Sequence, residues 1–389
     1  MKILFLTSYF EPDLSAGSFR NTALFKSLMT KVSENDFVHV ITTMPNRYST
    51  YQVSGQEHEE GKNYIIDRVP VPKNAGGMKG QIKTFLDYFK NAKKLTKGKK
   101  YDLVYASSSR LFTAYLGKCC AVKNNCPLYL DIRDIFVESI RYVYQNNPLI
   151  RIPFVYLLSK VEKYTFKKAN HINLVSEGFN YYFSRYPKPS YSYFTNGIDE
   201  EFIEARKQEV EVNNNPQLIV YAGNLGKGQG LEKVIPEAAQ KLGNEYKFLI
   251  IGDGGTKELL LKGVKDLGLD NVELIKPVSR KELIKYYQKA DYFFFHLNDL
   301  EHHKYVLPSK MFEYGAFDKP IIAGVAGYPR EFIETNLTNY IVFEPTKVDE
   351  FVEKFKALDY KKEKRDVFVD KFNRSNIMSA MADDILKCV

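Results

Sequence analysis

The sequence predicts two doubly wound α/β domains in one chain. The chain has 389 residues, more than one hydrophobic core usually organises. Its apolar runs are short and mostly continuous, which is typical of parallel strands buried on both faces, and amphipathic segments that suit helices separate them. Hydrophobic residues make up 44% of the chain and charged residues 26%, the profile of a soluble globular protein.

Six apolar runs in each half of the chain are predicted to be strands. In the first half they are 2–9, 38–43, 65–71, 103–106, 128–131 and 171–175. In the second half they are 218–222, 246–251, 272–275, 292–295, 320–323 and 340–343. The polar stretch 204–217 lies between the two sets and is predicted to be the linker region. We therefore expect an N-terminal domain over 1–203, a second domain over 204–370, and a C-terminal helix over 371–389 that packs back on the first domain.

The cysteines and the apolar runs restrict the cellular context. The four cysteines, Cys119, Cys120, Cys126 and Cys388, lack the C-x-x-C spacing of a zinc site, so we expect reduced thiols in the cytoplasm. The first ten residues, "MKILFLTSYF", lack the small-residue cleavage site of a signal peptide and are interpreted as a buried strand. No run approaches the roughly 20 apolar residues that a membrane span needs.

Positive charge is concentrated in the first half of the chain. Residues 1–200 contain 28 Lys and Arg against 17 Asp and Glu, whereas the remaining residues contain 28 against 30. A basic field of this kind attracts phosphate groups, either of nucleic acid or of a membrane surface.

A glycine-rich segment, "YAGNLGKGQGLE", stands between a predicted strand and a helix-like run. Its glycines are Gly223, Gly226, Gly228 and Gly230. Such a loop usually lets the backbone approach a ligand closely, most often a phosphate, and a following helix N-terminus adds positive potential. The spacing matches neither the dinucleotide-binding fingerprint nor the P-loop. A tight turn with a solvated lysine is the alternative.

Several segments, in order, resemble glycosyltransferase family 4, the retaining enzymes of the GT-B fold. In the second half they are "YAGNLGKGQGLEKVI", "FLIIGDGGTKELL", "LIKPVSRKELIKYYQKADYFFF" and "LPSKMFEYGAFDKPIIAG". In the first half, "SYFEPDLSAGSFRNTALFKSL" resembles the opening glycine loop of the family, and "NLVSEGFNYYF" and "FTNGIDEEF" resemble its hinge-side signatures. The segment "YLDIRDIFVES" resembles the aspartate-arginine-aspartate segment of the capsule and lipopolysaccharide branch. The resemblance implies two Rossmann-like domains facing an interdomain cleft.

The resemblance also implies a set of donor-binding residues. They are Ala16, Gly17, Arg20, Gly223, Asn224, Gln229, Gly252, Asp253, Gly254, Val278, Tyr305, Ser309 and Glu313. Glu313 would accept hydrogen bonds from the ribose hydroxyls. At three positions the sequence departs from the family: Asn224 and Gln229 replace an arginine and a lysine, and Tyr305 replaces a glutamate that touches the donor sugar.

The residues expected to carry the chemistry lie in both halves of the chain. Lys310 and Lys227 would stabilise the leaving diphosphate, a role that needs positive charge without a metal. Asp131, Arg133 and Asp134 end a predicted strand, where ligands bind in open α/β sheets, and an aspartate there would take the acceptor proton. A structural Asp–Arg pair is the alternative for this segment. The resemblance implies neither a metal site nor a cofactor other than the nucleotide sugar.

Two histidines and two lysine-rich segments also have candidate roles. His302 and His303 are adjacent and lack a metal-binding pattern, so we expect them to line the sugar pocket or a loop. The segments 79–100 and 147–168 carry apolar residues at helical spacing with many lysines, which is typical of a helix on an anionic membrane. The lysines expected to touch that membrane are Lys83, Lys90, Lys93 and Lys94. The alternative is that both stripes pack on the core and the lysines are solvated.

Together these observations predict a bacterial glycosyltransferase on the cytoplasmic face of the cell membrane. It would move a hexosyl or N-acetylhexosaminyl group from a nucleotide sugar, most simply a UDP-sugar, to a lipid-diphosphate-linked or glycan acceptor in surface polysaccharide assembly. A non-catalytic nucleotide-sugar-binding homologue acting as a partner subunit is one alternative, and a GT-B UDP-sugar epimerase is another. Nucleic-acid binding would explain the basic half but not the glycine loops, so no nucleic-acid partner is expected.

Overall fold

The computed structural model describes residues 1–13, 15–45, 55–72, 77–108, 111–208 and 214–389. The chain forms two compact units, each described here by itself. Unit 1 comprises Met1–Asn196 with Arg374–Val389, and unit 2 comprises Gly197–Asn373.

Unit 1 is built on an eight-stranded sheet with the order β3-β4-β2-β1-β5-β6-β7-β8. Its strands are β1 (Lys2–Leu6), β2 (Phe37–Thr43), β3 (His58–Gly61), β4 (Tyr64–Val69), β5 (Leu103–Ser108), β6 (Leu128–Ile132), β7 (His171–Leu174) and β8 (Ser190–Ser192). Neighbouring strands are parallel except β3, which pairs antiparallel with β4. Most of these strands are buried along their length, as continuous apolar runs require.

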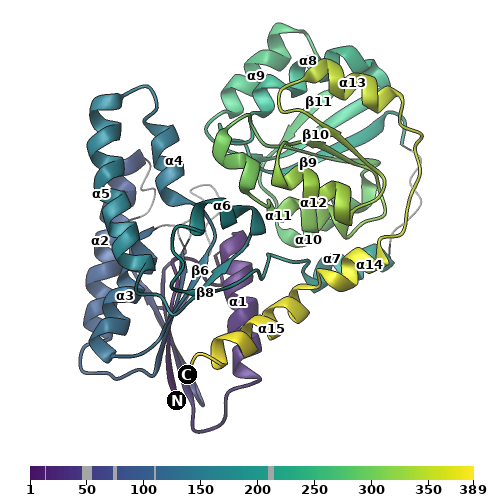
Figure 1. Ribbon diagram of the computed structural model, residues 1–389. Helices are drawn as coiled ribbons and strands as arrows, with labels where there is room; N and C mark the ends of the chain where they lie inside the picture. The colour runs from purple at the N-terminus through teal and green to yellow at the C-terminus, as the bar shows by residue number, and fades with distance from the viewer. Residues whose placement is uncertain (14, 46–54, 73–76, 109–110, 209–213) are drawn as a thin grey trace. The chain divides into compact units, whose positions relative to one another are not determined.

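Helices cover both faces of the unit 1 sheet (Figure 1). They are α1 (Ala16–Met29), α2 (Gly77–Leu95), α3 (Leu111–Asn124), α4 (Phe136–Val143), α5 (Pro148–Phe166), α6 (Asn180–Phe183) and the C-terminal α15 (Arg374–Leu386). Helices α2, α3 and α5 lie on one face, whereas α1 and α15 lie on the other. Helix α15 buries Met378, Met381 and Ile385 in the core of unit 1, so the end of the chain completes that core.

Unit 2 is built on a six-stranded parallel sheet with the order β11-β10-β9-β12-β13-β14. Its strands are β9 (Gln217–Asn224), β10 (Tyr246–Asp253), β11 (Val272–Ile275), β12 (Tyr292–His296), β13 (Ile321–Gly324) and β14 (Tyr340–Phe343). Its helices are α7 (Glu200–Lys207), α8 (Ile235–Leu242), α9 (Lys257–Asp266), α10 (Arg280–Lys289), α11 (Ser309–Gly315), α12 (Tyr328–Asn336), α13 (Val348–Lys356) and α14 (Asp366–Lys371).

Each sheet has a point at which the strand order reverses. In unit 1 this point lies between β1 and β5, and in unit 2 it lies between β9 and β12. The predicted pair of doubly wound sheets is confirmed. In such sheets ligands bind outside the carboxyl ends of the strands at this point. The loops after β9 and β12 are therefore the expected place of a binding site in unit 2.

Several sequence predictions need correction. The division between the units falls at Gly197 instead of residue 204, because α7 packs on unit 2, where Phe202 stacks on Tyr287. Part of the expected linker 204–217 is therefore helix α7 and the start of β9, while 209–213 lie outside the described residues. The short strands β3 and β8 were missed because neither is an apolar run.

The helix expected directly after the glycine loop begins later. A short 3-10 turn, Leu231–Lys233, comes first, and α8 then starts at Ile235 with Pro236 in its first turn. Proline is tolerated only at the start of a helix because it lacks a backbone N–H. The N-terminus of α8 is therefore separated from Gly230 by the 3-10 turn.

Candidate functional site

The strands β9 and β12 of unit 2 separate at the switch point of the sheet, where ligands bind in folds of this kind. These strands pair over two residues each, and the pairing stops at Val220 and Phe293. Beyond that point the Ala222 N–H donates a hydrogen bond to the Tyr314 hydroxyl at 3.1 Å instead of to β12. Tyr314 belongs to α11, so this bond fixes α11 against the end of β9. The helix that carries Lys310 and Glu313 is thus held at the switch point of the sheet.

The glycine loop 223–230 lies at this switch point and is packed by side chains from the segment after β12. Gly223 has φ +151°, and a Cβ there would overlap the ammonium group of Lys310. A Cβ on Gly228 would lie 3.3 Å from the imidazole of His303. The glycines are therefore needed for close approach to Lys310 and His303, which places a cation and an imidazole against the loop backbone.

Asn298 holds the tip of the glycine loop. Its N–H donates to the Gly228 carbonyl at 2.8 Å, and its Nδ2 donates to the Lys227 carbonyl at 2.9 Å. Its Oδ1 accepts a hydrogen bond from Lys233 Nζ at 3.1 Å. The sequence analysis missed this residue, although its place just after a predicted strand was a usable signal. Asn298 therefore fixes two consecutive loop carbonyls and so orients the loop.

His296, at the end of β12, is a second brace that the sequence analysis missed. Its Nδ1 donates to the Gln229 carbonyl at 2.5 Å, and its Nε2 accepts from the Thr346 N–H at 3.0 Å. Burial lowers the pKa of His296 to about 4, so the imidazole is neutral at pH 7. This protonation state matches the two bonds, because an uncharged Nε2 can accept.

Asn224 and Gln229 bind each other across the loop. Asn224 Nδ2 donates to Gln229 Oε1 at 2.9 Å, which closes the loop with a neutral amide pair. Both residues were expected to contact the donor. This bond shapes the loop, and because Asn224 is exposed and Gln229 is partly exposed, their contact with a donor stays a prediction.

Two lysines supply positive charge at the loop. Lys310 Nζ lies beside Gly223 and 5.2 Å from the centroid of the Tyr221 ring. Lys227 is exposed at the loop tip, and within the described part of the chain its ammonium group has no ion-pair partner. Lys310 is thus positioned by packing, whereas the Lys227 side chain is held only through its backbone.

Glu313 projects from α11 close to a hydroxyl and a cation. Its Oε2 accepts a hydrogen bond from the Tyr287 hydroxyl at 3.2 Å. Arg280, at the start of α10, forms ion pairs with Asp199 and Glu201. Burial lowers the pKa of Arg280, but Asp199 and then Glu313 raise it, and the net effect is a rise. The Glu313 side chain is therefore partly buried beside a hydroxyl and a guanidinium group, and its second oxygen still has acceptor capacity for a ligand.

The loop after β10 has a packing role. A Cβ on Gly252, with φ +151°, would overlap the Gly223 carbonyl, and a Cβ on Gly254 would overlap the Leu225 carbonyl. Asp253 Oδ1 accepts from the Gly254 N–H at 2.9 Å. These glycines were expected to line the base and ribose. Their observed contacts are instead with the loop after β9, so they explain how the two loops pack, and Asp253 remains partly exposed.

The segment after β12 carries the residues that stand in place of the missing glutamate. Tyr305 ends the 3-10 turn Glu301–Tyr305, and its hydroxyl donates to Glu301 Oε1 at 3.2 Å. His303 Nδ1 donates to the Asn298 carbonyl at 3.0 Å, so its Nε2 is the unprotonated nitrogen. Burial lowers the pKa of His303 and lowers that of His302 to about 4. His303 therefore offers a neutral acceptor beside Gly228.

Two donor-side residues have simpler surroundings. Ser309 starts α11 after Pro308, as the sequence predicted for a helix start. Val278 lies half-buried between β11 and α10.

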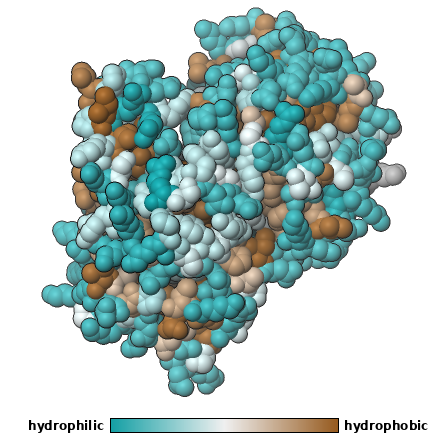
Figure 2. All heavy atoms as spheres, viewed as in Figure 1, coloured by the Kyte–Doolittle hydropathy of each residue, from teal (hydrophilic) through white to brown (hydrophobic). Residues whose placement is uncertain are grey.

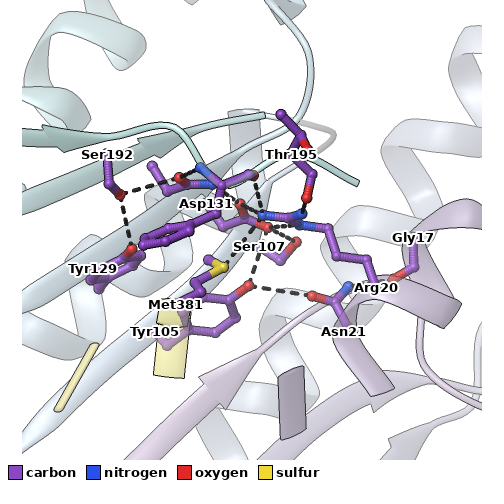
Figure 3. A network of polar contacts seen from close by, with 12 residues as sticks. Gly17, Arg20, Asn21, Tyr105, Ser107, Tyr129, Asp131, Ser192, Thr195 and Met381 are labelled. Atoms are coloured by element: carbon purple, nitrogen blue, oxygen red, sulfur yellow. Dashed lines mark hydrogen bonds and ion pairs between the residues drawn. The ribbon is translucent and has the colours of Figure 1, made fainter. Parts of the chain in front are cut away.

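In unit 1, Arg20 and Asp131 form a buried ion pair (Figure 3). Arg20 Nη2 and Nε lie 2.9 and 3.0 Å from the two Asp131 oxygens, and neither side chain is exposed. Arg20 also donates to the Thr195 carbonyl at 2.5 Å, and Asp131 accepts from Asn173 at 2.8 Å and from Ser107 at 3.1 Å. The expectations that Arg20 binds a donor phosphate and that Asp131 acts as a base are therefore wrong, because burial leaves neither accessible.

Arg133 and Asp134 remain candidates at the carboxyl end of β6. The Arg133 guanidinium lies against Gly17, where a Cβ would overlap it, and Ala16 begins α1 beside Gly17. Burial raises the pKa of Asp134 to about 6, although the Ser139 hydroxyl 3.3 Å away opposes the rise. A carboxyl group with this pKa can exchange a proton near neutral pH, as a general base must.

The helices expected to contact a membrane expose both lysines and apolar groups. Lys83, Lys90, Lys93 and Lys94 on α2 are exposed, and so are Ile82 and Leu86. Figure 2 shows hydrophobic residues gathered over the α4–α5 side of unit 1. Across the described ranges, no helix is long and apolar enough to cross a membrane. The same ranges contain no group of three His, Cys, Asp or Glu side chains that could hold a metal ion.

Comparison with known proteins agrees with this geometry. Residues 202–372 match the family model described as glycosyl transferases group 1, a segment that contains the glycine loop, Lys310 and Glu313. Unit 2 matches the group 1 glycosyl transferases. Over 72 residues the chain is 40% identical to an Escherichia coli K12 protein named as a colanic acid biosynthesis glycosyl transferase, WcaI. That alignment spans 18% of this chain and 17% of the relative.

Solved structures extend the similarity to the whole chain at the level of fold. The Anabaena protein HepE in complex with UDP and glucose has a TM-score of 0.65 at 15% identity, covering 100% of both chains. The lipopolysaccharide outer core galactosyltransferase WaaB in its apo form has a TM-score of 0.64 at 13% identity, also covering 100% of both chains. The two Rossmann-like units therefore form a GT-B fold, and the glycine loop 223–230 lies in its second unit.

Proposed function

We propose that the protein is a retaining glycosyltransferase that uses a UDP-sugar and acts in bacterial surface polysaccharide assembly. The observation that carries this proposal is the glycine loop at the switch point of unit 2, with Lys310 packed on Gly223 and Glu313 on the same helix. The match of residues 202–372 to group 1 glycosyl transferases and the names of WcaI and WaaB support the reaction class and the pathway.

The donor diphosphate is proposed to lie against loop 223–230. Loop N–H groups and the Lys310 ammonium would meet its negative charge, and Lys227 at the exposed tip would close on it. Glu313 would accept hydrogen bonds from the ribose hydroxyls, with Tyr287 holding the carboxylate in place. The complex of HepE with UDP and glucose supports a uridine nucleotide as the donor.

The chemical step needs charge stabilisation more than a strong base. As the glycosidic bond breaks, negative charge grows on the departing phosphate, and Lys310 is placed to stabilise it. The acceptor hydroxyl attacks from the face that the nucleotide leaves, and the departing phosphate takes its proton. His303 Nε2, beside Gly228, would accept a hydrogen bond from a sugar hydroxyl and so replace the carboxylate that Tyr305 does not supply.

The acceptor is proposed to be a lipid-diphosphate-linked saccharide at the cytoplasmic face of the membrane. Four exposed lysines and two exposed apolar residues on α2 support contact with an anionic surface. Each lysine near such a surface contributes on the order of 1 kcal/mol, an effect that salt weakens.

A panel of nucleotide sugars tests the donor. UDP-sugars should raise the melting temperature of the protein, since a ligand at 100 times its Kd adds about 2.7 kcal/mol to the stability of the folded state. ADP- and GDP-sugars at equal concentration are the controls. Transfer to an acceptor extract, followed by NMR of the new linkage, then reports the anomeric configuration. An inverted product would contradict the retaining mechanism.

A charge reversal on α2 tests the membrane contact. Changing Lys83, Lys90, Lys93 and Lys94 to Glu should abolish cosedimentation with phosphatidylglycerol vesicles. Changing four exposed lysines of unit 2, Lys262, Lys265, Lys281 and Lys285, to Glu alters the net charge equally and is the matched control. Equal loss in both variants would mean that only total charge matters, and the α2 contact would be wrong.

A second candidate is a nucleotide-sugar-binding partner subunit without activity. The residues Asn224, Gln229 and Tyr305 favour it, because they place neutral groups where the family that the sequence resembles has an arginine, a lysine and a glutamate. Binding of a UDP-sugar without donor hydrolysis or transfer, under conditions in which the complete assembly is active, would select this candidate.

A further inference from the structure

A cavity of about 410 Å³ lies in unit 1 at the amino ends of β6 and β7. This edge of the sheet is opposite to the one that carries Arg133 and Asp134. Its lining includes Lys118, Val122, Asn125, Cys126, Lys168 and Asn170. None of these residues has a role in the proposed transfer reaction.

Lys118 is the notable group in this cavity. It belongs to α3 and is only 4% exposed, yet its ammonium group has no carboxylate partner among the described residues. The ammonium group lies over the ring of Tyr164 in a cation–π contact, with Nζ 3.5 Å from the ring centroid. Lysines are almost never buried unless they are paired, because loss of hydration is costly. Because Lys118 is buried and lines the cavity, an anion bound there would supply the charged partner that its ammonium group lacks.

The surroundings of the cavity add positive charge. Lys168, directly after α5, is exposed at the lining and carries a second ammonium group. Asp102 is the nearby acid: burial and then Asp102 raise the pKa of the Cys126 thiol to about 11. Asp102 itself accepts the Lys2 N–H at 2.6 Å. The two lysines thus leave the cavity cationic.

Tyr164 connects the cavity to an exposed apolar stripe along α5. Leu149, Ile152, Tyr156 and Tyr164 are 87%, 64%, 64% and 54% exposed, and their spacing places them on one side of the helix. The same ring of Tyr164 contacts Lys118. Figure 2 shows hydrophobic residues on this side of unit 1. The apolar stripe of α5 therefore ends at Tyr164, whose ring contacts the ammonium group of Lys118.

The exposed side of α5 also lacks negative charge. The helix has a single acid, Glu162, which is 2% exposed and accepts hydrogen bonds from Tyr182 at 2.6 Å and Tyr186 at 2.8 Å. Lys160 Nζ lies 5.1 Å from the Tyr156 ring centroid, so the polar part of this side is basic. An apolar stripe with basic neighbours is typical of a helix lying at a membrane surface.

We propose that the cavity at Lys118 and Lys168 binds the phosphate headgroup of an anionic membrane phospholipid, with the lipid chains along the α5 stripe. A phospholipid carries a phosphate directly beside apolar chains, which matches the position of Lys118 beside the α5 stripe that ends at Tyr164. The inference extends the proposed membrane contact to a specific headgroup, and it does not depend on glycosyl transfer.

The test compares headgroups and two matched lysines. Lys118→Met keeps the methylene stem that packs near Tyr164 and removes only the charge. Lys123→Met, at the exposed end of α3, is the control. Cosedimentation is measured with phosphatidylcholine vesicles that contain phosphatidic acid or phosphatidylserine at equal mole fraction. Circular dichroism and melting temperature confirm that both variants fold.

The unaltered protein should bind phosphatidic acid vesicles about fivefold more tightly than phosphatidylserine vesicles, since one additional lysine–phosphate contact is worth on the order of 1 kcal/mol. Lys118→Met should lose this preference, and Lys123→Met should keep it. Equal binding of both vesicles by the unaltered protein, or an unchanged preference in Lys118→Met, would overturn the proposal even if the α2 lysines are needed for membrane contact.

Free phosphate is the competing source of the same chemistry. If glycerol 3-phosphate raises the melting temperature of the unaltered protein but not of Lys118→Met, while vesicles show no headgroup preference, the cavity binds a soluble phosphate and the lipid assignment is wrong. If the protein binds no vesicles and no phosphate protects it, both the headgroup site and the membrane contact fail. Transfer to a soluble acceptor is measured separately and tests the catalytic proposal alone.

Discussion

The two units share one strand order but place charge differently at their switch points. In unit 1, Arg20 from α1 and Asp131 from β6 neutralise each other in a fully buried pair. In unit 2, Lys310 packs on the backbone of Gly223, and Glu313 of the same helix accepts a bond from a neutral hydroxyl. The strand order of a sheet therefore does not determine whether the charged groups at its switch point are paired inside the fold.

The difference arises from what each sheet offers its polar groups. The buried carboxylate of Asp131 accepts bonds from Arg20, Asn173 and Ser107, so its hydrogen-bonding capacity is used inside the fold. In unit 2, Asn298 and His296 donate hydrogen bonds to carbonyl groups of the glycine loop. The loop backbone is thus held by neutral groups. Unit 1 thus holds a buried structural ion pair, whereas unit 2 holds a braced loop at the place where we propose that the donor binds.

The largest expected effect is on the buried ion pair. Arg20→Ala should destabilise unit 1 by about 3–5 kcal/mol, because it leaves the Asp131 carboxylate buried and unpaired. Denaturant unfolding followed by circular dichroism measures the change, and Arg141→Ala on the exposed face of α4 is the control. A loss below about 1 kcal/mol would mean that Arg20 is not structural and would reopen its role at a phosphate.

Lys310→Ala should leave stability nearly unchanged and lower kcat about 100-fold, the usual cost of removing one group that stabilises charge in the transition state. KM for the donor should change much less, because the diphosphate gains charge as the bond breaks. Lys241→Ala, on α8 and paired with Glu237 and Asp349, is the control. A rise in KM alone would show that Lys310 binds the ground state.

Glu313→Ala should weaken UDP binding by about 1.5–3 kcal/mol, as expected for a hydrogen bond to a charged group. Calorimetry with UDP measures the change. Tyr287→Phe removes the bond to Glu313 without removing the carboxylate, so its effect should be smaller. Unchanged UDP affinity in Glu313→Ala would exclude Glu313 from the donor site.

Asp134→Asn should stabilise unit 1 by about 2 kcal/mol at pH 7. The folded-state pKa is raised to about 6, so the fold favours the protonated carboxyl, and the ionised form becomes a cost as the pH rises from about 4 to 6. The asparagine avoids that cost, and the two proteins should have equal stability below pH 4. Unfolding curves at pH 3.5 and pH 7 test the sign, and a destabilised variant at pH 7 would contradict the burial of this carboxyl.

More of the fold than of the candidate site could be predicted from the sequence. Continuous apolar runs predicted all the parallel strands of unit 2 and six of the eight strands of unit 1 because burial on both faces leaves a direct signal. The strands β3 and β8 gave no such signal, since they lie at the sheet edges and are polar. For the site, the sequence placed Lys310 and Glu313 on one helix, but it could not reveal Asn298 and His296 as braces of the glycine loop.

By itself the sequence determined the strands, the glycine positions and the concentration of positive charge in residues 1–200, because these depend on local composition and spacing. Only the tertiary structure decided which charges remain available. Arg20 and Asp131 are 111 residues apart and meet only when β6 and α1 pack together, which turns two candidate site residues into a structural pair. Lys118 shows the converse, because burial in α3 leaves its ammonium group without a carboxylate partner among the described residues. Whether a charge is solvated, paired or left for a ligand depends on contacts between segments that are distant in the chain.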